Sequence, residues 1–354
     1  VLEAFQSRFR ENLFENYFPF WDRTGVDHEN GGFYCWLSED GEIVSDQKYM
    51  WYQGRGLWVY SHAYRIFGQN PAFFEIAKKT YSFLLKYGRD EEGYWRSSVG
   101  PVGEPSEPRD AMGYAGVFVA EGMQEYARAS GDAEALEHSL EAFERSMRLF
   151  NDPNRFAEEE YLPEYYPGIR LLGHEMVRIR YLRQVLEQRD APDLRQALET
   201  AVQHLFEDFY LPDHGLTIEG LDFHYQARQD ANRSLCLLGH SMEAFWMILD
   251  AGVFLGRSDW VDKAMERFWS HHRASWDADA QMYRTVVDLN KGPHAGQVIW
   301  HFDEAVIMFL MIYSLTGSPW ALDWAEKIEA RAEELFRVEG KQGTIWARDT
   351  DDAG

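Results

Sequence analysis

The chain has 354 residues, of which 45% are hydrophobic and 16% aromatic, so it can build a large core as one large domain or two ordinary ones. Its formal charge of −24 excludes general electrostatic attraction to nucleic acid or to an anionic lipid surface, and it suits a neutral substrate. We expect a cytoplasmic protein, because the two cysteines form no CxxC pair and the N-terminal segment is charged. We also expect that it spans no membrane, because no uninterrupted apolar run reaches about 18 residues.

A polar segment recurs about every 62 residues along the chain. Each copy opens with Asp or Glu, and Gly beside alternating aromatic and polar residues is typical of a small β-hairpin. The copies begin at Asp27, Asp90, Asp152, Asp213, Asp277 and Glu339.

Between these segments the apolar residues follow the 3.6-residue period of an α-helix. A polar amphipathic helix is predicted before each copy, over 2–18, 71–88, 132–150, 192–209, 258–274 and 319–336. A more apolar helix is predicted after each of the first five copies, over 48–67, 108–129, 168–189, 235–255 and 297–316. Gly68 and Gly317, each followed closely by a proline, separate an apolar helix from the next polar one.

Repeated helix, hairpin and helix units predict an all-α (α/α)6 barrel that forms a single domain over 1–354. The polar helices would lie outside and the apolar helices inside, and an open helical solenoid is the alternative. The inner helix expected after the sixth hairpin, the twelfth of the barrel, is missing from this chain. Either the barrel closes with eleven helices or the twelfth lies beyond Gly354, and we expect the second arrangement.

Polar residues at the starts of the inner helices would face the central cavity of such a barrel. His240 and Glu243 are the sharpest pair, because a spacing of three residues puts both on one helix face. A carboxylate beside an imidazole raises its pKa and fixes its orientation, which favours a general base over a hydrogen-bonded core histidine. Arg55 suits charge-assisted binding of a sugar oxygen or an enediolate, or else pairing with a nearby carboxylate.

Other chemistries lack their usual signals. The sequence has no GxGxxG, P-loop, HExxH or GxSxG motif and no His/Asp cluster with metal-ligand spacing, so we expect no cofactor and no metal. The neighbouring His271 and His272 fall at the end of a polar helix, where we expect them to be solvated.

Three stretches, KYMWYQGR (48–55), GHSMEAFW (239–246) and IWHFDEA (299–305), carry a family pattern. They resemble the K-Y-x-W-x-Q-G-R, P-G-H-x-x-E-x-x-W and W-W-x-x-x-E-A motifs of the N-acylglucosamine 2-epimerase family. The resemblance extends from about residue 5 to the end of the chain. Leu238 in place of the usual proline, and His301 and Phe302 after the tryptophan, depart from the pattern.

The resemblance implies roles at matching positions. Arg55 would contact substrate, and His240 would be a catalytic histidine with Glu243 as its neighbouring acid. His174 falls on the third inner helix, where some branches of the family carry a histidine. The residues predicted to bind substrate are Trp51, Gln53, Trp300, Asp303 and Glu304. A second catalytic histidine, in a K-G-x-x-H pattern on the sixth inner helix, would lie beyond the end of this chain.

The expected function is therefore a sugar 2-epimerase or aldose–ketose isomerase that shifts the C2 proton through an enediol. The resemblance favours interconversion of N-acetylglucosamine and N-acetylmannosamine, with mannose isomerisation or mannose 2-epimerisation as alternatives. An (α/α)6 glycoside hydrolase, with Asp110 and Glu164 as candidate carboxylates, and a non-catalytic sugar-binding protein are the rival functions. The expected partner is a small-molecule sugar, and the family suggests a homodimer.

Overall fold

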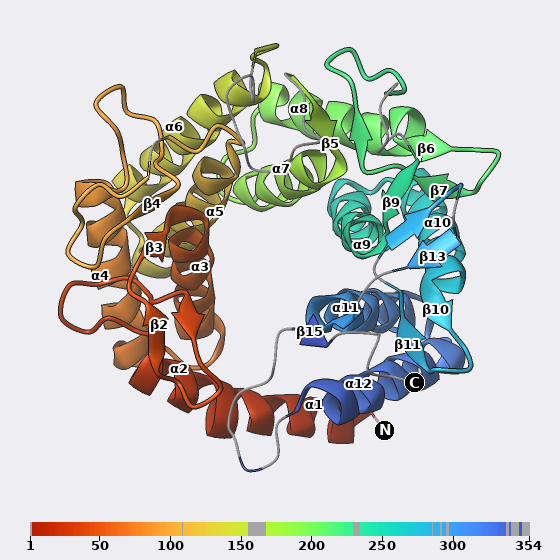
Figure 1. Cartoon of the computed structure of the whole chain (residues 1–354), viewed down its shortest axis with the longest axis horizontal. Helices are drawn as coiled ribbons and strands as arrows, with labels where there is room; N and C mark the ends of the chain where they lie inside the picture. Colours follow the sequence, from red (N-terminus) through yellow and green to blue (C-terminus); the bar gives the residue numbers. More distant parts are fainter. Residues whose placement is uncertain are drawn as a thin grey trace. The chain divides into compact units, whose positions relative to one another are not determined.

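The computed structural model describes residues 2–107, 109–154, 168–228, 234–284, 286–290, 292–294, 297–337, 340 and 347–348. They form helices joined by loops with short strands (Figure 1). The chain groups into two compact units: unit 1 comprises Val1–Asn16, Ile169–Arg183 and Ala191–Gly354, and unit 2 comprises Tyr17–Gly168 and Gln184–Asp190. The single domain expected over 1–354 stays a prediction.

Unit 2 is built from two pairs of helices. α3 (Met50–Ile66) packs on α4 (Pro71–Tyr87), α5 (Tyr114–Ser130) packs on α6 (Ala133–Phe150), and α3 also packs on α5. The short α2 (Phe18–Thr24) precedes them. Leu57 on α3 and Val119 on α5 are fully buried, so the apolar members of the two pairs form the core of this unit.

Unit 1 repeats the same arrangement. α9 (Leu238–Leu255) packs on α10 (Ser258–Ser275), α11 (Ile299–Thr316) packs on α12 (Pro319–Phe336), and α9 also packs on α11. α1 (Leu2–Glu11), the part of α7 (Leu172–Val185) up to Arg183, and α8 (Pro192–Gln203) belong to the same unit. The predicted alternation of polar and apolar helices is confirmed in the part of the chain that the structure describes.

Capping groups fix several helix ends. The side chains of Asn70 and Asp132 accept hydrogen bonds from the backbone N–H groups of the first turns of α4 and α6. Gly256 and Gly317 end α9 and α11 at φ angles of 69° and 66°, a left-handed conformation that glycine adopts without a steric cost.

Two helices contain π-helical turns that the periodicity does not predict. The first predicted helix, 2–18, continues through η1 (Asn12–Tyr17) into α2 and ends only at Thr24. Pro19 in α2 has no N–H to donate to an α-helical hydrogen bond, and the π-helical turn lies immediately before it. The second case, η2 (His204–Asp208), follows α8.

Three loops contain the expected local hairpins. They are formed by β1 (Trp36–Leu37) with β2 (Ile43–Ser45), β6 (Tyr210–Leu211) with β7 (Leu216–Thr217), and β10 (Trp276–Asp277) with β11 (Met282–Tyr283). Parts of the loops that begin at Asp152 and Glu339 lie outside the described residues.

Other strands pair between successive loops. A strand directly before an apolar helix pairs antiparallel with a strand of the following loop, and this places neighbouring helix starts beside each other. These pairs are β3 (Lys48–Tyr49) with β4 (Ser98–Val99), β5 (Arg170–Leu171) with β8 (Gly220–Leu221), β9 (Leu235–Leu237) with β12 (Val286–Asp288), and β14 (Gln297–Val298) with β15 (Ala347–Arg348); β13 (Gly292–His294) adds to β12.

α11 is the one described helix whose length and composition would allow it to cross a membrane. It carries His301, Asp303 and Glu304 near its start and packs against both α9 and α12. A core helix of a soluble protein has the same composition, so this feature is weak evidence for a membrane span.

Candidate functional site

The facing sides of α9 and α11 hold the polar residues predicted in unit 1. The ring of His240 lies 5.4 Å from the ring of Trp300, and Nε1 of Trp246 donates a hydrogen bond to Oε2 of Glu304 at 2.5 Å. Glu304 follows Trp300 by about one helical turn, and Trp246 follows His240 by six residues, about 1.7 turns. The structure therefore places His240 beside Trp300, and Glu304 beside Trp246, where α9 packs on α11.

The carboxylate in contact with His240 comes from a loop. Nδ1 of His240 lies 3.0 Å from Oε1 of Glu219, and both side chains are partly open, at 25% and 20% exposure. The expected partner, Glu243, is buried on α9 and has no hydrogen bond to this ring among the described residues. Glu219 is not among the residues predicted from the sequence. The one feature that could have indicated it is a charged residue within the alternating TIEGL segment (217–221).

Two acids at the start of α11 have unusual protonation equilibria. Burial, and then the negative charge of Glu243, raise the pKa of Glu304 well above its usual value of 4.5. Asp303 is an exposed residue of α11. Loss of hydration nevertheless raises the pKa of its carboxyl to about 6, and the negative charge of Glu333 makes a smaller contribution. The raised pKa favours the protonated form of Glu304, while Trp246 donates to one of its oxygens.

His301 lies behind the site rather than in it. Its ring is fully buried, its centroid is 4.0 Å from that of Trp300, and its two nitrogens have no hydrogen-bond partner among the described residues. Burial, and then the proximity of His240, lower the pKa of His301 to about 3, so this ring stays neutral. A Cβ atom on Gly239 would lie 2.1 Å from its Nε2, which explains why glycine precedes His240.

The histidine of the third apolar helix is also buried. His174 is 3% exposed near the start of α7, and the neighbouring Glu175 accepts a hydrogen bond from the hydroxyl of Tyr225 at 2.6 Å. Arg178 contacts the other oxygen of Glu175 at 3.3 Å. These contacts fix Glu175 as a structural acid, and they leave the predicted catalytic role of His174 a prediction.

In unit 2, Arg55 and Trp51 form an exposed aromatic and cationic surface. The guanidinium carbon of Arg55 lies 4.4 Å from the ring centre of Phe118 and 5.8 Å from that of Trp51. No described carboxylate pairs with Arg55, so its charge is available to a ligand oxygen.

Gln53 holds the first loop against α3. The side chain is fully buried, its Oε1 accepts from the backbone N–H of Phe33 at 2.7 Å, and its Nε2 donates to the carbonyl of Phe33 at 2.9 Å. Its predicted binding of substrate stays a prediction. The solvated state expected for His271 and His272 is wrong, because both rings are buried at 0% and 1% exposure.

The hydrolase hypothesis loses one of its two candidates. Asp110 accepts backbone hydrogen bonds from Met112 at 3.0 Å and Ala115 at 2.6 Å, which makes it a structural group at the start of α5. Glu164 lies outside the described residues. The described residues contain no group of three His, Cys, Asp or Glu side chains that could hold a metal ion.

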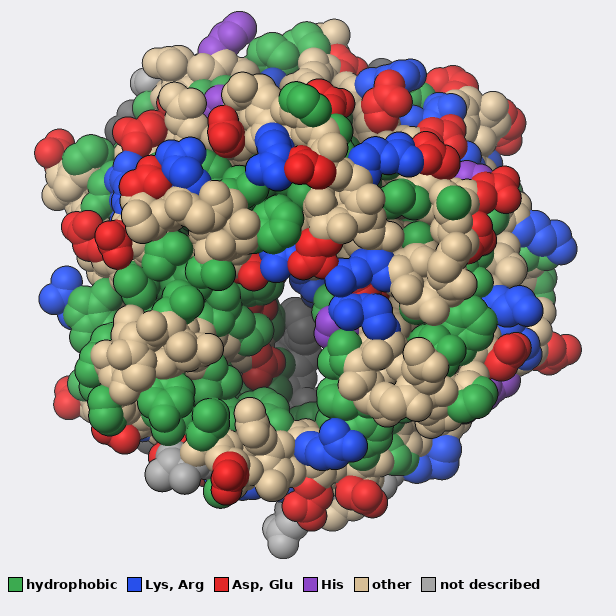
Figure 2. Space-filling model, turned by 180° about the vertical axis from the view of Figure 1, so that it is seen from behind, with side chains coloured by type: hydrophobic (Ala, Val, Ile, Leu, Met, Phe, Trp, Pro, Cys, Tyr) green, Lys and Arg blue, Asp and Glu red, His purple; other side chains and the backbone are tan. Residues whose placement is uncertain are grey.

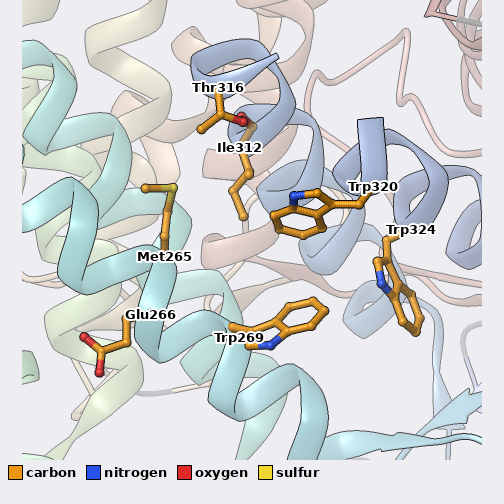
Figure 3. Close-up of a pocket in the computed structure, with 7 residues that line it drawn as sticks. All are labelled: Met265, Glu266, Trp269, Ile312, Thr316, Trp320 and Trp324. Atoms are coloured by element: carbon orange, nitrogen blue, oxygen red, sulfur yellow. The ribbon is translucent and has the colours of Figure 1, made fainter. Parts of the chain in front are cut away.

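A separate groove of about 670 Å³ lies on unit 1 (Figure 3). It is lined by side chains of α10, α11 and α12: Met265, Glu266, Trp269, Ile312, Thr316, Trp320 and Trp324. Apolar side chains gather on parts of the face in Figure 2. Independently of that view, the exposed large hydrophobic residues of unit 1 include Val253, Leu315 and Trp320. None of the predicted site residues lines this groove.

Comparison with known proteins gives consistent relatives. A family model described as N-acylglucosamine 2-epimerase matches residues 31–354. The N-acylglucosamine 2-epimerase of Bos taurus is 24% identical over 343 residues, which cover 90% of this chain and 78% of the relative. The cellobiose 2-epimerase of Ruminococcus albus is 26% identical over 366 residues, with coverage of 96% and 89%.

Solved structures share the fold. The cellobiose 2-epimerase of Bacillus thermoamylovorans has a TM-score of 0.85 at 19% identity, with 99% of this chain and 92% of that chain covered. A D-mannose isomerase has a TM-score of 0.79 at 12% identity, with coverage of 99% and 91%. This likeness supports the paired-helix fold, whereas the twelfth helix stays a prediction.

Proposed function

The chain belongs to the N-acylglucosamine 2-epimerase family, and on that premise we propose that it is a sugar 2-epimerase that interconverts N-acetylglucosamine and N-acetylmannosamine. The observation that carries the proposal is the place of His240 on α9, held by Glu219 and beside Trp300 of α11, whose next helical turn carries Glu304. A base and an acid whose environments set different protonation states are what a proton shift requires.

The proposed reaction begins with the open-chain sugar, whose C1 carbonyl makes the C2 proton acidic. His240 removes that proton, and the electron pair of the C2–H bond forms the C1–C2 double bond of an enol, which is an enediol where C2 carries a hydroxyl, while the carbonyl oxygen gains a proton. Glu304 is the proposed donor to that oxygen, because its raised pKa favours the protonated carboxyl. As the C1 carbonyl re-forms, its proton returns to Glu304, C2 takes a proton from water or a second acid on its opposite face, and His240 releases the first proton to solvent; the acid and base each contribute roughly 10²–10⁴ in rate.

The other predicted residues enter the proposal as binding groups. Trp300 supplies an aromatic face beside His240, and aromatic side chains pack well against the C–H faces of a sugar. Within unit 2, the exposed guanidinium of Arg55 beside Phe118 suits a ligand oxygen, and its contact with substrate stays what the resemblance implies.

Cellobiose is the second candidate substrate. The relative from Ruminococcus albus is a cellobiose 2-epimerase, and its identity of 26% is similar to the 24% of the bovine N-acylglucosamine 2-epimerase. The proposed chemistry at C2 is the same for both sugars, and the part of the substrate beyond the reacting ring distinguishes them.

Exchange of the C2 proton in D₂O tests the proposal. We would incubate the protein separately with N-acetylmannosamine, N-acetylglucosamine, mannose, glucose and cellobiose and follow the C2 signal by proton NMR. We expect loss of that signal together with a new epimer, and at least about 10²-fold slower exchange in His240→Gln. His214→Gln, which changes an exposed histidine of the same unit, is the matched control. Absence of exchange with every sugar in a folded protein would refute the proposed reaction.

A further inference from the structure

We infer that Glu219 is a positioning residue that selects the ring tautomer of His240 and aims its second nitrogen at the substrate, an inference that rests on the proposed function. The distance of 3.0 Å between Glu219 Oε1 and His240 Nδ1 is that of a hydrogen bond. A carboxylate oxygen accepts a hydrogen bond from a ring N–H, so this contact favours the tautomer with the proton on Nδ1 and leaves Nε2 as the basic nitrogen.

The backbone around Glu219 holds its carboxylate in place. Its N–H donates to the carbonyl of Leu235 in β9, directly before α9, and its carbonyl accepts from the N–H of Leu172, the first residue of α7, both at 2.9 Å. β8, which begins at Gly220, pairs with β5. Glu219 is thus tied to the start of the helix that carries His240 and to the start of the helix that carries His174.

His240 is also restrained on its other sides. Its ring contacts Trp300, and the glycine before it packs against the buried His301. These contacts position the ring. The contact of Glu219 with Nδ1 favours one of its two tautomers, in the way that a carboxylate orients a catalytic imidazole in other enzymes.

Glu219→Gln is the direct test. Glutamine has the same shape and keeps the backbone bonds, but its amide can donate to Nδ1 and stabilise the wrong tautomer. We expect kcat for the sugar to fall by about 10- to 100-fold. KM should stay within about twofold of the wild-type value, and the melting temperature within a few degrees. Asp208→Asn is the matched control, because it removes the carboxylate from another histidine contact of unit 1, that of His204 at 2.6 Å.

A second variant and a spectroscopic measurement separate positioning from folding. In Glu219→Ala, added formate or acetate would restore part of the lost kcat by occupying the vacated position. Two-bond ¹H–¹⁵N spectra of ¹⁵N-histidine-labelled protein, assigned with His240→Gln, would show the Nδ1–H tautomer of His240 in wild type and a changed tautomer in Glu219→Gln.

The outcomes distinguish this inference from the proposed function. The tautomer of His240 is measured without substrate. A wild-type protein that is inactive but has the Nδ1–H tautomer would therefore refute the proposed reaction and still support the positioning role of Glu219. Wild-type kcat in Glu219→Gln, or an unchanged tautomer of His240, would overturn the inference. Loss of kcat without rescue by a small carboxylate and without a tautomer change would assign Glu219 a structural role only, which also overturns it.

Discussion

Glu304 combines burial with one defined hydrogen-bond donor, the indole of Trp246. Because its pKa is raised well above 4.5, the neutral acid persists to a higher pH than that of an ordinary glutamate. If Glu304 donates a proton in the reaction, kcat/KM should decline as the pH rises through that pKa.

Glu304→Gln should keep the contact with Trp246, since the amide oxygen can accept from the indole N–H, while it loses the transferable proton. We expect kcat/KM at neutral pH to fall by about 10²-fold and its alkaline decline to disappear. The pH profile of kcat/KM measures both effects, with Glu266→Gln in the separate groove as the control. An alkaline limb that survives in Glu304→Gln would assign the proton to another group.

Single residues of the site were predictable to different extents. The positions of His240, Trp300 and Glu304 at the starts of apolar helices could be predicted from helical spacing and the family pattern. The contact of His240 with Glu219 could not be predicted, since it depends on strand pairing between segments that are not adjacent in sequence. Nothing in the sequence shows that both ends of the Gln53 amide bind the backbone of Phe33.

At the scale of elements, Lys48 explains why the first motif begins with lysine. Its Nζ is fully buried and donates to Oδ2 of Asp27 at 2.7 Å and to the carbonyls of Gly31 and Pro101, both at 2.8 Å. These bonds join the first loop, β3 and the second loop. Lys48 and Gln53 are thus structural parts of a motif whose exposed members are Trp51 and Arg55.

Removal of one partner of this buried pair should be costly. Lys48→Met leaves Asp27 without its cation, and we expect the free energy of unfolding to fall by about 3–5 kcal/mol in urea titrations. Asp27→Asn/Lys48→Met should lose less than Lys48→Met alone, because it leaves no uncompensated charge. A Lys48→Met protein as stable as wild type would show that the pair does not hold the loops together.

The helices were predictable where local signals are strong. The predicted segments 71–88 and 319–336 agree with α4 (Pro71–Tyr87) and α12 (Pro319–Phe336), which both begin at a proline. The segment 108–129 starts too early, because Asp110 binds the backbone of the turn before α5. The strands that join successive loops could not be predicted, since each is two or three residues long and its partner is distant in sequence.

At the scale of the whole molecule, periodicity was the strongest predictor. The same pairing of an apolar with a polar helix recurs within each unit, as α3 with α4 and as α9 with α10. A repeated sequence predicts this result because each apolar helix must bury most of its surface against neighbours. Long-range side-chain contacts carry no such period, and so the details of the site escaped prediction.

Buried neutral histidines should make stability depend on pH. Burial lowers the pKa of His271 to about 4 and that of His272 to about 3, and the ring of His272 is surrounded by Trp269, Trp324 and Phe309. Between these values and about 6.5, the unfolded chain binds protons that the folded chain does not, so these groups reduce stability as the pH falls. The raised pKa of Asp303 acts in the opposite direction between about pH 4 and 6.

His272→Phe isolates one of these contributions. The variant loses the hydrogen bond between His272 and the hydroxyl of Tyr283, which lowers the free energy of unfolding by an amount that varies little with pH. It also removes one protonation site. Relative to the variant, wild type should therefore lose up to about 1.4 kcal/mol of unfolding free energy per pH unit from about pH 6.5 down to pH 4. Urea titrations of both proteins over this range measure the difference, with exposed His214→Gln as the control. Parallel curves for wild type and His272→Phe would mean that His272 is protonated in the folded protein as readily as in the unfolded chain, against the burial that the structure shows.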